Sequence, residues 1–237
     1  MNFRLSLLLG VFLLVGFTEP LPQPKPLDPL EAAKQGRALA AEILSQRPSQ
    51  NFTNTGVLII GKGMEIQVKF ETLVTATNWQ SVYEATWSNR VETLSIIHAA
   101  EQSNVYFSHG NQLTGVEASA PFAGSDFWRC DLGLEFFHWP EQKILKTELR
   151  KTRSCKVLES INPQPATNGY SRVVSWIDTE SLGIIHADAY DAAGKWLKEF
   201  DPKTVKEING QPQLVKMEIY NRQTRSRSQI EFNFEAK

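Results

Sequence analysis

A strict alternation of apolar and polar residues constrains the fold of this chain more than any other feature. The segment 64–70 (MEIQVKF) places four apolar residues on one side and three polar residues on the other, and 79–87 repeats the pattern. Successive side chains of a β-strand point to opposite faces of the sheet, so both segments predict strands with one apolar face. The residues expected to form this face are Ile66, Val68, Phe70, Tyr83 and Trp87.

Further strands follow along the chain, separated by turn signals rich in Gly, Asn and Asp. They are predicted at about residues 91–98, 103–107, 143–149, 155–160, 170–177, 184–190, 195–200, 204–208, 213–221 and 228–234. Strands at this spacing, with little helical pattern between them, predict a mainly β protein. We expect an antiparallel sheet that is curled or closed, because long exposed strand edges promote aggregation.

The N-terminus has the pattern of an export signal. Arg4 precedes a thirteen-residue apolar run, 5–17 (LSLLLGVFLLVGF). A transmembrane helix needs about 20 such residues, so 1–18 is predicted to be a secretory signal peptide, with an uncleaved N-terminal anchor as the alternative. We therefore expect localisation to a bacterial periplasm.

A proline-rich linker, 19–27, and an amphipathic helix, 28–46, follow the leader. Asp28 and Pro29 are typical of the first turn of a helix, and an apolar stripe along it predicts packing on a hydrophobic surface. The length of 28–237 fits a single domain. Without Arg4 the chain has 24 basic and 26 acidic residues, which gives no reason to expect nucleic acid as a partner.

The segment 125–142 (SDFWRCDLGLEFFHWPEQ) concentrates five of the nineteen Phe and Trp residues. Its apolar residues at helical spacing predict a mobile lid helix, 125–139, over the mouth of the sheet. Those expected to contact a ligand are Phe127, Leu134 and Phe137. Asp131, Glu135 and His138 trail this stripe by one position, and we expect them to flank it at the water boundary rather than to converge on a pocket.

The two cysteines, Cys130 and Cys155, are expected to form a disulfide, because an exported protein meets an oxidising compartment. No motif for nucleophilic catalysis, phosphate binding or zinc binding is present, and the four histidines lie on different predicted elements. We therefore expect no catalytic residues, no bound metal and no cofactor.

A sheet with one apolar face must bury that face, and two short helices are too few to cover it. The remaining apolar surface either forms a cavity for an apolar ligand or is filled by side chains of the protein itself. The sequence pattern leaves both alternatives open.

The C-terminal half resembles the LolA-like outer-membrane lipoprotein-sorting family over about residues 120–234. The resemblance begins with the segment DFWRCDLGLEFF and a following strand that contains Cys155–Leu158. It continues with two strand ends, Trp176–Asp178 and Tyr190–Asp191. It also includes a hairpin at Gly194–Lys195 and the turn Ile208–Gly210, which precedes a strand at Met217–Ile219. It implies an unclosed β-barrel with helices over its mouth and acyl chains in an apolar cavity.

The function expected from this resemblance is a monomeric, non-enzymatic periplasmic carrier of lipid or lipoprotein acyl chains. Its partners would include an inner-membrane donor and an outer-membrane acceptor protein. The alternative is a regulatory module of the cell envelope that senses lipoproteins, because one fold can serve several functions.

Overall fold

The computed structural model describes residues 27–99, 102–208 and 211–233, and within them the protein is mainly β. The helices are α1 (Pro29–Ser45), α2 (Gly115–Ala118), α3 (Arg129–Leu132) and the 3-10 helix η1 (Glu135–His138). The strands are β1 (Phe52–Ile60), β2 (Met64–Val74), β3 (Trp79–Trp87), β4 (Arg90–Ala99), β5 (Gln102–Ser108), β6 (Asn111–Gln112), β7 (Glu141–Arg150), β8 (Arg153–Ile161), β9 (Arg172–Asp178), β10 (Ile184–Tyr190), β11 (Trp196–Ile208), β12 (Gln211–Asn221) and β13 (Ser226–Phe232).

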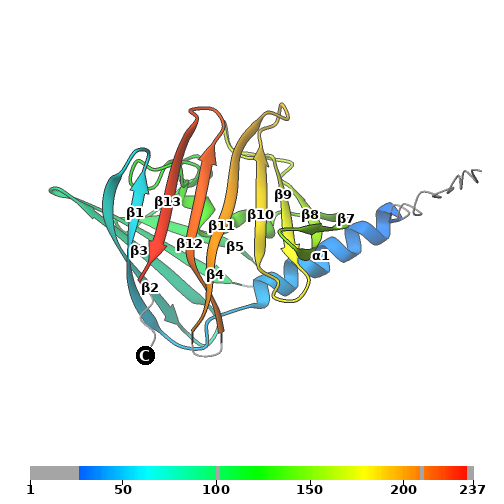
Figure 1. Ribbon diagram of the computed structural model, residues 1–237, viewed down its shortest axis with the longest axis horizontal. Coiled ribbons are helices and arrows are strands. Elements are labelled where there is room, and N and C mark those ends of the chain that lie inside the picture. Colours follow the sequence, from blue (N-terminus) through cyan, green and yellow to red (C-terminus); the bar gives the residue numbers. More distant parts are fainter. Residues whose placement is uncertain (1–26, 100–101, 209–210, 234–237) are drawn as a thin grey trace, which may run out of the picture.

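These strands form one curved antiparallel sheet that is not closed (Figure 1). Its order is β6-β5-β4-β3-β2-β1-β13-β12-β11-β10-β9-β8-β7, so β1 pairs with β13, the last strand of the chain. The early strands extend the sheet to one edge at β6, and the later strands extend it to the other edge at β7. Residues 113–140, which we call the crossing segment, connect these two edges in sequence.

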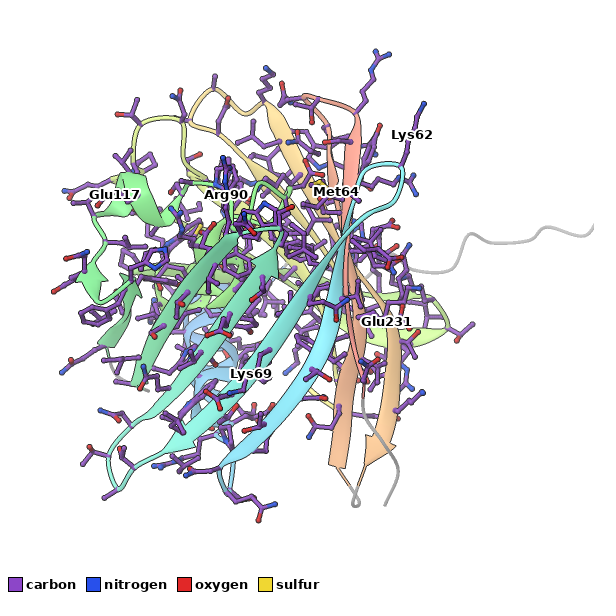
Figure 2. All side chains as sticks on the ribbon, turned by 90° about the vertical axis from the view of Figure 1, so that its left-hand side faces the viewer. Lys62, Met64, Lys69, Arg90, Glu117 and Glu231 are labelled. Atoms are coloured by element: carbon purple, nitrogen blue, oxygen red, sulfur yellow. The ribbon has the colours of Figure 1, made fainter. Side chains whose placement is uncertain are left out.

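Alternation along the strands defines the inner face, as predicted. On β2, Ile66 and Val68 are buried, and they lie opposite Leu58 of β1 and Ala85 of β3. Lys69 of β2 and Glu231 of β13, both labelled in Figure 2, lie at the intervening positions, whose side chains point to the other face.

The helix α1 begins where the sequence predicts it. The Asp28 carboxylate accepts hydrogen bonds from the backbone N–H groups of Leu30 (2.9 Å) and Glu31 (3.3 Å), which satisfies two donors that the first turn leaves unpaired. The buried stripe packs against β7, and a Cβ at Gly36 would lie 2.4 Å from Lys143 Cα. Only glycine allows this close approach of helix and strand.

Most predicted strands are confirmed, with three differences. The predicted strands 195–200 and 204–208 are one strand, β11, because a register shift at Pro202–Thr204 accommodates a proline that has no N–H to donate. The strands β1 and β6 had no predicted range. The predicted signal peptide, 1–18, and residues 19–26 of the predicted linker, 19–27, lie outside the described residues, as do 209–210 and 234. Within the described part of the chain, no helix has the length and hydropathy needed to cross a membrane.

Candidate functional site

A cleft of about 620 Å³ opens between the β6 end of the sheet and the connection between β8 and β9. One wall comes from β5, β6 and α2, and another comes from residues 162–170 of that connection. The remaining lining residues belong to α3, η1 and the turn that follows η1. Ligand sites of small molecules commonly have volumes of about 300–1,000 Å³, so the cleft is large enough to hold one.

The crossing segment is fastened to the middle of the sheet through Asp126. Its carboxylate accepts hydrogen bonds from Ser226 (2.6 Å) and Ser228 (2.8 Å) of β13, and its backbone N–H donates to Ser228 Oγ at 2.9 Å. Asp126 is 8% exposed, so these bonds are shielded from water. They hold the start of the aromatic stretch on the inner face of the sheet.

A second attachment joins the crossing segment to β4. Glu92 accepts two hydrogen bonds from the Arg129 guanidinium (2.9 and 3.2 Å) and one from the backbone N–H of Ala123 (3.0 Å). A third attachment uses Gln142 of β7, whose amide donates to the carbonyls of Phe136 and Trp139, both at 2.9 Å. These attachments on different strands fix the segment in place.

The predicted lid helix over 125–139 is wrong. The helix α3 has four residues, Leu134 then adopts a left-handed backbone conformation (φ 50°), and the chain continues as the 3-10 helix η1. Tyr106 of β5 packs against Gly133, and this contact leaves no room for a side chain there. A Cβ at this position would lie 2.2 Å from Tyr106 Oη.

Asp131 is buried in an ion pair and does not lie at the water boundary. Its Oδ2 is 3.2 Å from Nζ of Lys198 on β11, and both side chains are 1% exposed. The same Oδ2 accepts a hydrogen bond from the backbone N–H of Trp128 (2.7 Å) and from the Tyr170 hydroxyl (3.3 Å). One carboxylate oxygen therefore joins α3, β11 and the loop before β9.

Aromatic rings complete the surroundings of Lys198. Its ammonium lies 3.7 Å from the ring centre of Trp128 and 5.4 Å from that of Tyr170. The two rings stack, with centroids 4.4 Å apart. An ammonium over aromatic faces is stabilised by the negative potential of the rings, which offsets part of the cost of removing it from water. Burial nevertheless lowers the pKa of Lys198 and raises the pKa of Asp131.

Glu135 occupies a second polar position in the cleft. Its carboxylate accepts a hydrogen bond from the Tyr106 hydroxyl at 3.0 Å. Burial raises the pKa of Glu135 to about 7, and hydrogen bonds from Tyr106, Asn104 and Ser103 oppose this shift. Burial also lowers the pKa of His138, which lines the same cleft. The expectation that Asp131, Glu135 and His138 flank the segment without converging is therefore wrong, because all three line one cleft.

The eight apolar residues predicted to bind ligand lie together on the inner side of the sheet. Five are buried in one hydrophobic cluster, and three are partly buried against it; in chain order they are Ile66, Val68, Phe70, Tyr83, Trp87, Phe127, Leu134 and Phe137. Side chains of the crossing segment thus fill much of the inner face. Tyr83 and Leu134 line a smaller cavity of about 160 Å³, whose wall also includes Asp131.

The predicted disulfide is absent, and both cysteines are free thiols. Cys155 alternates with Leu158 and Ser160 along β8, so its side chain points to the outer face, while Leu158 belongs to the inner cluster. Cys130 packs on the inner side, within the crossing segment. The sheet therefore separates the two sulfur atoms. The even cysteine count and the predicted export did not indicate on which side of the sheet each cysteine lies.

The sequence reasoning missed Lys198, Tyr170, Trp128 and Tyr106. A signal existed for Lys198, because it lies two positions before Phe200 on β11 and so on the same face, and Phe200 is buried on the inner face. A lysine at an apolar position of a strand indicates a buried partner. No comparable pattern in the sequence identifies Tyr170, Trp128 or Tyr106. Across the described ranges, no group of His, Cys, Asp and Glu side chains is arranged to hold a metal ion.

The open antiparallel sheet, with α1 packed along its β7 edge and a cleft at its β6 end, defines a LolA-like fold. A putative outer membrane lipoprotein-sorting protein domain from Vibrio parahaemolyticus superposes with a TM-score of 0.74 at 18% identity, over 85% of this chain and 92% of that one. A DUF1329 family protein from Desulfovibrio piger gives 0.71 at 19% identity, over 85% and 91%. A LolA superfamily protein from Nitrosomonas europaea gives 0.60 at 16% identity, over 86% and 92%.

A family model described as "-like: Uncharacterized protein" matches residues 106–235, more than half of the chain, and the chain belongs to that family. No curated protein matches the sequence. The identities of the solved structures are below 20%, so the likeness is one of fold.

Proposed function

We propose that this protein is a non-catalytic periplasmic carrier that binds an acyl chain of a lipid or lipoprotein in the cleft of about 620 Å³. The observation that carries the proposal is the position of this cleft at the open end of a LolA-like sheet. Export by a signal peptide at 1–18 would bring the chain to the compartment where such cargo is sorted. In this proposal residues 28–237 act as a single, monomeric domain.

The cleft offers an apolar path for an acyl chain. Val105, Leu113, Val116, Phe136 and Trp139 contribute apolar side chains to its walls. Each CH₂ group moved from water into such a site contributes about 0.8 kcal/mol, so a chain of ten carbons provides useful affinity without specific polar contacts. Of the eight residues predicted from the sequence, Tyr83 and Leu134 line the smaller cavity, and cargo that enters it would contact these two.

The experiment compares the lipid that co-purifies with the full-length protein and with two variants. Val116→Asp places a carboxylate on the cleft wall at a position that is 56% exposed, so folding should tolerate it. Leu149→Asp is the matched control, because Leu149 is 76% exposed at the far end of β7 and does not line the cleft. Mass spectrometry of extracted lipid should find cargo on the wild type and on Leu149→Asp, and much less on Val116→Asp.

Two outcomes would contradict this proposal, the first its binding site and the second its carrier function. Equal lipid on all three proteins would place the cargo elsewhere. A wild-type protein without lipid that captures one envelope protein would support the regulatory module instead. A carrier must also release its cargo, so lipid should move from the loaded protein to acceptor vesicles. This transfer is the step that the proposed donor and acceptor proteins would use.

A further inference from the structure

The charged groups of the cleft are of one sign. Its lining includes the carboxylates of Asp131 and Glu135 and, among the described residues, no lysine or arginine. The nearby cations are already paired: Lys198 binds Oδ2 of Asp131 and lies over the Trp128 ring, and Arg129 binds Glu92 and the carbonyl of Glu117. A ligand with an anionic end would therefore meet the Glu135 carboxylate, which has no positive side chain beside it in the cleft lining.

The two carboxylate oxygens of Asp131 differ in their hydrogen bonding. Asp131 is 1% exposed, and its Oδ2 receives three donors, while its Oδ1 has no hydrogen-bond partner among the described residues. Asp131 borders both cavities. A buried oxygen without a donor is costly, so a ligand that supplies an N–H or O–H group there removes this cost.

Aromatic rings favour a cation in the same place. Tyr106, Phe136, Trp139 and Tyr170 all line the cleft, and the faces of such rings attract ammonium groups. The protein already uses this arrangement once, where Lys198 lies over Trp128 and Tyr170. The cleft thus combines apolar walls, aromatic faces and carboxylates, which together match an alkyl chain that ends in an amine.

We propose that the cleft binds an amphiphile whose polar end is an ammonium group, with that group near Glu135 and Asp131 and the alkyl chain along the apolar wall. This inference rests on the proposed carrier function and specifies the chemical class of its cargo. An amphiphile with a carboxylate or phosphate end and no amine should bind more weakly, because the Glu135 carboxylate repels it.

The test uses three probes of equal chain length, which are decylammonium, decanol and decanoate, each below its critical micelle concentration. Binding to the full-length protein is followed by displacement of a fluorescent alkyl probe at about pH 8, where Glu135 is ionised. Decylammonium should bind about tenfold more tightly than decanoate, with decanol between them, since a charge-assisted hydrogen bond is worth about this factor.

Three variants assign the preference to the cleft. Glu135→Gln should reduce the ratio between decylammonium and decanoate to about threefold or less. Asp131→Asn should act in the same direction, and if it fails to fold, Glu135→Gln decides the question alone. Glu141→Gln, an exposed residue at the start of β7 that does not line the cleft, should leave the ratio unchanged.

The outcomes separate the inference from the function on which it rests. Equal binding of all three probes, or tightest binding of decanoate, overturns the ammonium preference and leaves the carrier function standing. A preference that survives in Glu135→Gln and in a folded Asp131→Asn also overturns it. No binding of any probe contradicts the carrier function itself, and the inference falls with it.

Discussion

Nζ of Lys198 lies 3.2 Å from Oδ2 of Asp131, and this ion pair joins β11 to the crossing segment in the interior of the protein. The residues are 67 positions apart in the sequence. Both are desolvated, so each depends on the other and on the rings and donors around them. Asp131 lines the cleft, so this ion pair fixes the position of one of the cleft walls.

Removing one partner of this pair should destabilise the protein strongly. Lys198→Met or Asp131→Asn leaves the other group buried without its partner, which typically costs about 3–5 kcal/mol of unfolding free energy. The double variant should cost less than the sum of the single ones. Urea denaturation measures all three.

The matched control for this prediction is Lys143→Met. Lys143 lies 2.6 Å from Glu159 but is 47% exposed, so its loss should cost no more than about 1 kcal/mol. If Lys198→Met costs as little as Lys143→Met, the buried pair does not stabilise the fold.

The crossing segment should be a fixed part of the structure. Asp126→Ala removes the acceptors of Ser226 and Ser228 and should cost about 1–3 kcal/mol. It should also speed hydrogen exchange at Phe122, whose N–H bonds the carbonyl of Phe127 at 2.7 Å. Glu141→Ala should change neither quantity, because its side chain is exposed. If the Phe122 amide exchanges rapidly in the unliganded wild type, the crossing segment is mobile and the hypothesis of a mobile lid is supported.

Glu135 should make stability depend on pH. Burial raises its pKa from 4.5 to about 7, so the folded state holds the proton more tightly than the unfolded state. Its contribution is fully present below pH 4.5 and is lost as the pH rises through about 7. Glu135→Gln stays neutral and should gain stability relative to the wild type across this range, by at most about 3 kcal/mol.

This pH effect is measured by urea denaturation at several pH values, with Glu141→Gln as the exposed control. A constant difference between Glu135→Gln and the wild type from about pH 5 to about pH 8 would show that Glu135 does not carry the shift.

Both cysteines should be titratable thiols. In unreduced protein that is denatured, a thiol reagent should react with Cys130 and Cys155, since the two side chains lie on opposite sides of the sheet. In the native protein Cys130 should react slowly, because burial raises the pKa of its thiol well above the usual value. Finding no free thiol in the denatured protein would establish a disulfide.

The sheet was predictable because strand alternation is a local pattern. Ile66 and Val68 alternate with polar neighbours, and any sheet with one buried face places them on that face. The start of α1 was predictable for the same reason, since Asp28 caps a helix through bonds to residues two and three positions away. The LolA-like resemblance added the open arrangement of the sheet, which alternation alone left undecided.

Only the tertiary structure decided the conformation of the crossing segment and the residues of the cleft. Its apolar residues have helical spacing, yet Asp126 bonds to Ser228 at a distance of 102 residues and Tyr106 occupies the space beside Gly133. Long-range hydrogen bonds and close packing outweigh a local propensity of about 1 kcal/mol per residue or less. For the same reason the pairing of Lys198 with Asp131 depends on which strands become neighbours, and no local pattern in the sequence specifies that.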